Sequence, residues 1–190
     1  MAVKTLCSHI TSPGGSPLFW NDLVIPAQGI NLSGTPAPPT PDTALLGDGC
    51  LLFSNTVENN VAVQFQMPHD WCEGTDIHLH MHWCKTTADT GTVLWDAKWS
   101  VAKVGTVFPA MSAYATASVE VANADTADLH AISEWAAISM TGNTLSTIVK
   151  VVMRRDATNG SDTYDQNAKL LGIDVHYQID APGSLQELLK

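Results

Sequence analysis

Residues 76–84, Asp-Ile-His-Leu-His-Met-His-Trp-Cys, alternate strictly between apolar side chains and side chains that can bind protons or metals. Successive side chains of an extended strand point to opposite faces, so the alternation predicts a β-strand with two unlike surfaces. One surface carries the apolar residues Ile77, Leu79, Met81 and Trp83, and the other carries Asp76, His78, His80, His82 and Cys84. The strand therefore requires a core on one side and polar contacts on the other.

Short runs rich in Val, Ile, Thr and aromatic residues fill the chain from residue 49 to residue 180. Turn-forming residues separate these runs, which predicts about eight strands and no long helix. The expected strands lie near residues 50–55, 60–67, 76–85, 92–103, 116–123, 130–140, 144–155 and 170–180. Turn-like segments at 87–91 and 141–144 predict two antiparallel hairpins. We therefore expect an all-β fold, an antiparallel β-sandwich of jelly-roll type.

An extended Pro/Gly-rich N-terminal arm is expected over residues 1–48, before the sandwich at 49–180 and a C-terminal tail at 181–190. Residues 12–48 hold most of the prolines, which favour extended chain and exclude long helices. Four apolar residues within the arm are too hydrophobic for a free tail, and we expect them to contact the domain itself, another subunit or a capsid: Phe19, Trp20, Leu23 and Ile25.

Charge and composition argue against several classes of partner. The 190-residue chain has a formal net charge of -10, which disfavours binding to nucleic acid, because that affinity depends on Lys and Arg neutralising phosphates. No window approaches the roughly 18 apolar residues of a membrane helix, and the N-terminal residues lack a signal-peptide pattern. Charged residues make up only 15% of the chain, so we expect part of the surface to be covered by another chain. Cys7, Cys50, Cys72 and Cys84 show no CxxC spacing, and reduced thiols are expected.

Three interpretations of the histidine row at His78, His80 and His82 remain open at this point. In the first, the row faces a polar surface of another subunit, and its imidazoles bind Asp76, Asp174 or backbone groups. In the second, histidines from three subunits meet at a threefold axis and hold a structural metal ion at the interface, with His176 as a further candidate ligand.

The third interpretation is a cupin-like metalloenzyme. The histidine row would hold a metal inside a β-barrel, with His176 or Asp174 as the ligand from a neighbouring strand. His130 or Glu134 would then act as acid or base. The first and third histidines of the row cannot bind one ion from a straight strand, because their backbones lie about 13 Å apart.

Other candidate motifs are weaker. Ser133 and Glu134 near His130 lack a Gly-x-Ser-x-Gly elbow, so no catalytic triad is expected. Arg154-Arg155 followed by Asp156 and Asp162 predicts an ion-pair cluster at a strand end. Tryptophans at strand positions are expected to anchor the core or an interface, namely Trp71, Trp83, Trp95, Trp99 and Trp135.

Four stretches of the chain together resemble structural proteins of tailed bacteriophages. They are residues 66–83, Phe19-Trp20-Asn21-Asp22-Leu23, Asp162-Thr163-Tyr164, and Asp174-Val175-His176-Tyr177-Gln178-Ile179-Asp180 with Gly183-Ser184. The resemblance spans most of the chain and implies a virion protein of the cement or decoration type, with no catalytic residues and no cofactor.

On this basis we expect a non-enzymatic virion structural protein, most simply a trimeric capsid cement protein that stabilises the head. Its partners would be copies of itself and the major capsid protein or another virion protein, without nucleic acid or membrane. It would be assembled in the host cytoplasm and found in the virion. The alternatives are a tail adaptor, baseplate or fibre-attachment component, and the metalloenzyme described above.

Overall fold

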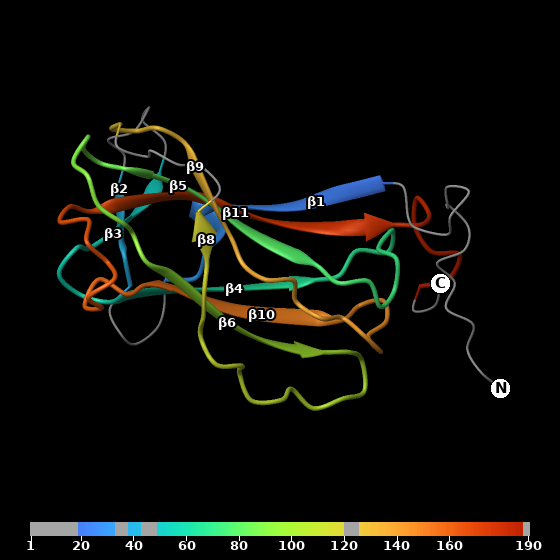
Figure 1. The fold of residues 1–190 in the computed structure, drawn as a ribbon. Coiled ribbons are helices and arrows are strands. Elements are labelled where there is room, and N and C mark those ends of the chain that lie inside the picture. Colours follow the sequence, from blue (N-terminus) through green and yellow to red (C-terminus); the bar gives the residue numbers. More distant parts are fainter. Residues whose placement is uncertain (1–18, 33–37, 43–48, 120–125, 188–190) are drawn as a thin grey trace.

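The computed structural model describes residues 19–32, 38–42, 49–119 and 126–187. Within these ranges, eleven strands and one short 3-10 helix form two antiparallel sheets that face each other (Figure 1). The expected all-β antiparallel sandwich is confirmed. No helix in the described ranges is long and apolar enough to cross a membrane.

The larger sheet has seven strands in the order β2-β3-β11-β5-β9-β8, with β1 also paired to β11. Its strands are β1 (Phe19–Pro26), β2 (Thr40–Asp42), β3 (Cys50–Phe53), β5 (His78–Lys85), β8 (Ser118–Val119), β9 (Ala131–Glu134) and β11 (Ala168–Ile179). The smaller sheet has the order β4-β10-β6-β7, with β4 (Asn59–Gln66), β6 (Trp95–Ala102), β7 (Ala115–Thr116) and β10 (Ile148–Arg155). The 3-10 helix η1 (Ala27–Gly29) follows β1.

The connections between strands follow a jelly roll. The chain passes from β3 to β4, from β5 to β6 and from β9 to β10, and each time it moves to the opposite sheet. The two hairpins predicted at 87–91 and 141–144 are therefore wrong, because those segments join strands of different sheets. Their turn residues do reverse the chain, but the two-faced strands on either side bury their apolar faces against each other across the sandwich instead of pairing edge to edge.

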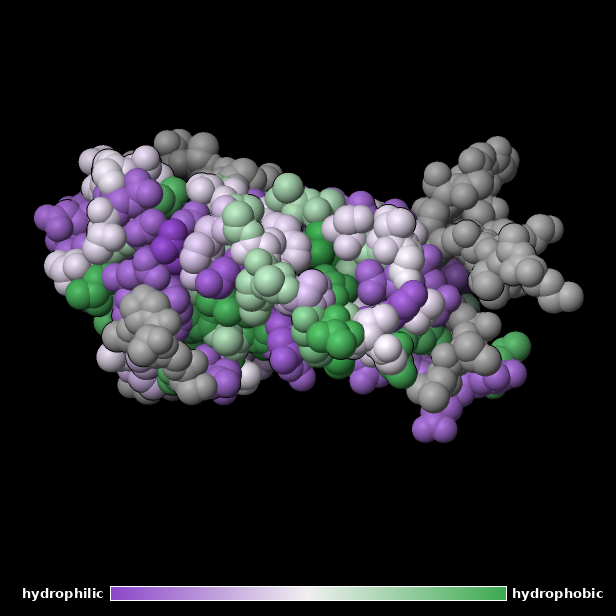
Figure 2. Space-filling view, turned by 90° about the horizontal axis from the view of Figure 1, so that it is seen from below, coloured by the Kyte–Doolittle hydropathy of each residue, from purple (hydrophilic) through white to green (hydrophobic). Residues whose placement is uncertain are grey.

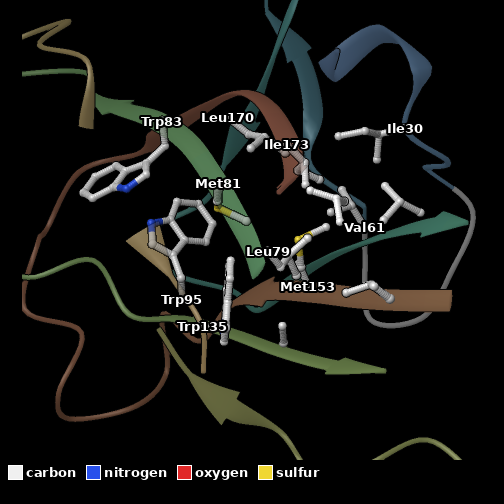
Figure 3. Packing of buried hydrophobic residues seen from close by; sticks show 14 of the residues in the cluster. Ile30, Val61, Leu79, Met81, Trp83, Trp95, Trp135, Met153, Leu170 and Ile173 are labelled. Atoms are coloured by element: carbon white, nitrogen blue, oxygen red, sulfur yellow. The ribbon is translucent and has the colours of Figure 1, made fainter. Parts of the chain in front are cut away.

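The core lies between the sheets and takes the predicted apolar face of β5. Ile77, Leu79 and Met81 are fully buried, and Trp83 is 2% exposed. Figure 3 shows Leu79 and Met81 of β5 directed into the same space as Met153 of β10, which comes from the other sheet. Burial of each such side chain contributes about 1.5–3 kcal/mol relative to its exposure. The two-faced character of the strand is confirmed.

The tryptophans at strand positions lie mostly in this core. Trp71, Trp83, Trp95 and Trp135 are buried, and Trp99 is partly buried against them. The indole of Trp83 packs edge-on to that of Trp95, with ring centroids 5.7 Å apart. Their predicted role as anchors is confirmed for the four buried residues.

Two described segments of the predicted arm are strands of the larger sheet. β1 pairs along its whole length with β11, from Phe19 opposite Ile179 to Pro26 opposite Gly172, and β2 pairs with β3. An irregularity in β11 between Leu170 and Gly172 marks the place where its neighbour changes from β3 to β1. Residues 1–18, 33–37 and 43–48 of the arm lie outside the described residues.

The outer face of the smaller sheet is partly covered by the segment that joins β6 to β7. The backbone N–H of Ser112 donates to the backbone oxygen of Trp99, and the N–H of Trp99 donates to Oγ of Ser112. The ring of Phe108 lies under Lys150 Nζ at 4.3 Å. Figure 2 views the molecule from this side, where hydrophobic residues stand in patches among hydrophilic ones. The segment between β6 and β7 thus covers part of the outer face of the smaller sheet.

The cysteines do not all behave as predicted. Cys50 and Cys84 are free and buried, as expected. Cys72 is disulfide-bonded. The prediction of reduced thiols is wrong for Cys72, because sequence spacing carries no information about which distant segments the fold brings together.

Candidate functional site: the histidine face

Four adjacent strands place polar side chains on the outer face of the larger sheet. β5 lies between β11 and β9, so His80 stands opposite Asp174 on one side and opposite Glu134 on the other. β1 extends the array beyond β11, where Asp22 stands opposite His176. We call this surface the histidine face; it consists of Asp22, His78, His80, His82, Glu134, Asp174 and His176.

Asp174 lies at the centre of the histidine face and is only 8% exposed. Its Oδ2 atom lies 3.1 Å from Nε2 of His82 and 3.0 Å from Nε2 of His176. Its Oδ1 atom is buried and accepts no hydrogen bond within the described ranges. The side-chain atom recorded next to Oδ1 is Nδ1 of His80, at 3.6 Å, which is beyond hydrogen-bonding distance.

Other carboxylates and one further histidine flank this centre. Oε1 of Glu134 lies 3.4 Å from Nδ1 of His78 and 3.8 Å from Nε2 of His80. Oδ1 of Asp22 lies 3.3 Å from Nε2 of His176. Beyond β5, Nδ1 of His82 lies 2.7 Å from Nε2 of His130. The face therefore combines several carboxylate–imidazole contacts with a direct contact between two imidazoles, those of His82 and His130.

Local fields keep the central groups in different charge states. Burial, and then the neighbouring His176, lower the pKa of His80 below its ordinary value. For Asp174, burial acts to raise the pKa, but hydrogen bonds and charge from His82 and His176 outweigh it and leave the pKa lowered. At neutral pH, His80 is thus a neutral imidazole beside the ionised carboxylate of Asp174.

The histidine face is hollowed beside Trp20. A pocket of about 260 Å³ is lined by Trp20, His78, His80, Glu134 and His176. The Trp20 ring meets the His78 ring edge-on, with centroids 5.4 Å apart. This pocket gives the polar face one aromatic wall.

The predicted contact residues on β1 divide into two that pack against the core and two that are exposed. Leu23 and Ile25 pack against the core of their own chain. Phe19 and Trp20 are 51% and 52% exposed, and Val24 is 68% exposed. The predicted contact residues did not include Asp22, although the alternation of β1 places it on the same face as Trp20 and Val24.

The histidines of β5 do not point into an enclosed barrel. Their side chains lie on the outer face of the larger sheet, opposite the buried Leu79 and Met81. This position differs from the interior metal of the cupin-like hypothesis. Asp174 and His176, which that hypothesis named as partners from a neighbouring strand, do lie beside His80.

The remaining motifs have structural roles. Ser133 is buried and accepts a hydrogen bond from the indole nitrogen of Trp83, whereas its neighbour Glu134 lies on the outer face. Arg155 is fully buried and binds Asp162 through two hydrogen bonds. The carboxylates near Arg154 are Glu58, Asp96 and Asp156. The predicted ion-pair cluster is confirmed.

Comparison with known proteins assigns no family, since no family model and no curated protein matches the chain. Among solved structures, TmCBM61 in complex with β-1,4-galactotriose matches 84% of this chain and 88% of its own, at 9% identity and a TM-score of 0.36. Dimeric latent PorU from Porphyromonas gingivalis matches 86% of this chain at 11% identity and a TM-score of 0.36. The insecticidal delta-endotoxin Cry8Ea1 from Bacillus thuringiensis matches 80% at 11% identity and a TM-score of 0.38. This chain spans only 13% and 23% of the latter two proteins.

Proposed function

We propose that this chain is a non-enzymatic structural protein of a bacteriophage virion, a trimeric capsid cement protein that docks through the histidine face and the adjoining outer face of β1. The observation that carries the proposal is the exposure of Trp20 and Val24 on either side of Asp22, at the edge of the histidine face. Aromatic and aliphatic anchors beside a polar array are the composition of protein interfaces.

Two further features support a role in assembly. β1 pairs with β11 on one side, and no other described strand pairs with it, so its other edge offers backbone groups to a neighbouring chain. The resemblance of four stretches to structural proteins of tailed phages supplies the virion context. A jelly roll with such an edge strand is suited to repeated contacts between identical subunits.

The first test is the oligomeric state of the full chain, measured by size-exclusion chromatography with light scattering. The proposal expects three times the 20.3 kDa chain mass. The double variant Trp20→Ala, Val24→Ser should shift the protein toward monomer. Val57→Ser is the matched control, because Val57 is 48% exposed but lies in the turn between β3 and β4.

The second test is the place of the protein in particles of the phage that encodes it. Gold labelling over the whole head would support the cement role. Labelling confined to one vertex would move the protein to the tail, as an adaptor, baseplate or fibre-attachment component. A stable monomer that is absent from particles would contradict both placements.

A further inference from the structure

We propose that His80, Asp174 and His176 bind one Zn²⁺ ion on the histidine face. One ligand atom from each of these residues lies within 4.8 Å of the other two. Asp174 and His176 sit on β11 and His80 on β5, where Asp174 is directly paired with His80 and His176 is paired with His78, two residues before His80. The inference concerns the folded chain alone and does not depend on the proposed virion role.

The spacing of the ligand atoms fits a zinc ion after small side-chain movements. Bonds of about 2.0–2.1 Å at a tetrahedral angle place neighbouring ligand atoms roughly 3.3 Å apart. Nδ1 of His80 and Oδ1 of Asp174 already lie 3.6 Å apart. The rings of His80 and His176 meet edge-on, with centroids at 4.1 Å, and Nε2 of His176 lies 3.0 Å from the other oxygen of the same Asp174 carboxylate.

The second, independent observation is the orphaned oxygen of Asp174. A buried carboxylate oxygen without a hydrogen-bond donor loses the interactions it had with water, and such positions need a physical reason. Oδ1 of Asp174 is in this position within the described ranges, and Nδ1 of His80 faces it at 3.6 Å, too far for a hydrogen bond. A cation between these two groups would satisfy the carboxylate oxygen and the imidazole nitrogen together.

The surrounding residues are arranged as supports for such a site. Hydrogen bonding from His82 occupies Oδ2 of Asp174, which leaves Oδ1 for the ion. Glu134 stands on the Nε2 side of the His80 ring, at 3.8 Å, where a carboxylate orients a metal-bound histidine. Asp22 lies 3.3 Å from Nε2 of His176 and is the nearest recorded carboxylate beyond Asp174 itself.

The donor set selects the class of metal. Two imidazoles and one carboxylate suit Zn²⁺ and neighbouring first-row divalent ions, whereas Ca²⁺ and Mg²⁺ require mostly oxygen ligands. Because its ligands come from β5 and β11, the ion would clamp the two central strands of the larger sheet. This arrangement differs from a site shared at a threefold axis, because all three ligands belong to one chain.

Isothermal titration of the untagged full chain with Zn²⁺, after treatment with a chelator, tests the proposal. We expect one ion per chain, against one ion per three chains for a shared axial site. Asp174→Asn and His176→Gln should each weaken the affinity about 100-fold or more, since loss of an outer-shell partner alone costs 10–100-fold. His69→Gln is the matched control, because His69 forms a hydrogen bond with Ser184 and is not part of the histidine face. This variant should bind zinc as the unaltered chain does.

Circular dichroism shows whether each variant is folded. If a variant is unfolded, the visible spectrum of the unaltered chain with Co²⁺ decides instead, because tetrahedral Co²⁺ absorbs strongly and octahedral Co²⁺ only weakly. A weak octahedral spectrum, binding without a defined stoichiometry, or equal affinity in Asp174→Asn and the unaltered chain would overturn the proposal. Binding at one ion per chain by a protein that does not trimerise would leave the zinc site standing and remove only the cement role.

Discussion

Oδ1 of Asp174 and Nδ1 of His80 face each other at 3.6 Å across the pairing of β11 with β5. The carboxylate oxygen is buried and accepts no hydrogen bond among the described residues. A buried carboxylate oxygen that lacks a hydrogen-bond donor costs folding free energy. Covering the core does not require such a group. The histidine face is therefore where we place the proposed zinc site.

The two faces of β5 should respond differently to truncation. Met81→Ala removes a fully buried side chain and should lower the free energy of unfolding by about 2–5 kcal/mol. His78 lies on the outer face, so His78→Ala should change the free energy of unfolding by less than about 1 kcal/mol. Urea unfolding followed by tryptophan fluorescence measures both values. Equal losses at the two positions would contradict the assignment of faces.

Arg155 should be among the most sensitive polar positions. It is fully buried, holds both oxygens of Asp162 and also donates to the backbone oxygens of Tyr164 and Gln166. Arg155→Ala leaves the carboxylate of Asp162 buried without its partner, which typically costs about 3–5 kcal/mol. In a double-mutant cycle, adding Asp162→Ala should cost much less in the Arg155→Ala background than alone. Additive losses would show that the pair does not interact.

Gly91 should not tolerate a side chain. Its φ is +132°, and a Cβ atom there would lie 2.6 Å from the backbone oxygen of Thr163. Gly91→Ala should therefore destabilise the fold more than Gly74→Ala, because Gly74 has φ of +81° but open space around it. Backbone strain alone costs roughly 1–2 kcal/mol at Gly74. Thermal unfolding of the two variants compares the costs, and equal midpoints would contradict the close approach at Gly91.

The free cysteines should be unreactive in the folded protein. Burial, and then the charge of Asp128, raise the pKa of Cys84 to about 11, and burial followed by Asp42 raises the pKa of Cys50. At pH 8, iodoacetamide should modify both thiols in guanidinium chloride and neither in the native state, as located by peptide mass spectrometry. Native modification of Cys84 at the unfolded rate would contradict its burial.

The same shift predicts a pH dependence of stability. The pKa of Cys84 is raised from 9.0 to about 11 on folding, because the folded state disfavours the ionised thiolate. The contribution of this shift to the free energy of unfolding is fully present below pH 9, where the thiol is neutral in both states. That contribution should be lost as the pH rises from 9 to 11, because the unfolded thiol ionises first. Cys84→Ala should show a shallower loss of stability over this interval. An identical slope in the two proteins would contradict the shift.

The sequence predicted the local features of the fold well. Period-two alternation placed Leu79 and Met81 in the core and the histidines of β5 outside, because the side-chain period of a strand is fixed by backbone geometry. It also placed Asp174 and His176 on one face of β11. That Asp174 lies opposite His80 depends on register between segments 94 residues apart, which alternation does not specify.

Long-range and composition-biased features were harder to predict. The turn at 87–91 was expected to close a hairpin, but the jelly roll sends β6 to the other sheet, and only tertiary burial decides between these outcomes. β1 lies in a Pro-rich region with little strand signal, yet pairing with β11 makes Phe19–Pro26 a strand. The disulfide bond of Cys72 was likewise not predicted, because the spacing of cysteines in the sequence does not show which of them meet in the fold.

Electron cryomicroscopy of the virion in which we propose that this chain acts as a cement protein is the most direct test of that proposal. We expect three copies around an axis on the outside of the head, with Trp20, Val24 and the histidine face buried against neighbouring subunits. Particles in which this face is open to solvent and the opposite sheet makes the contacts would contradict the account.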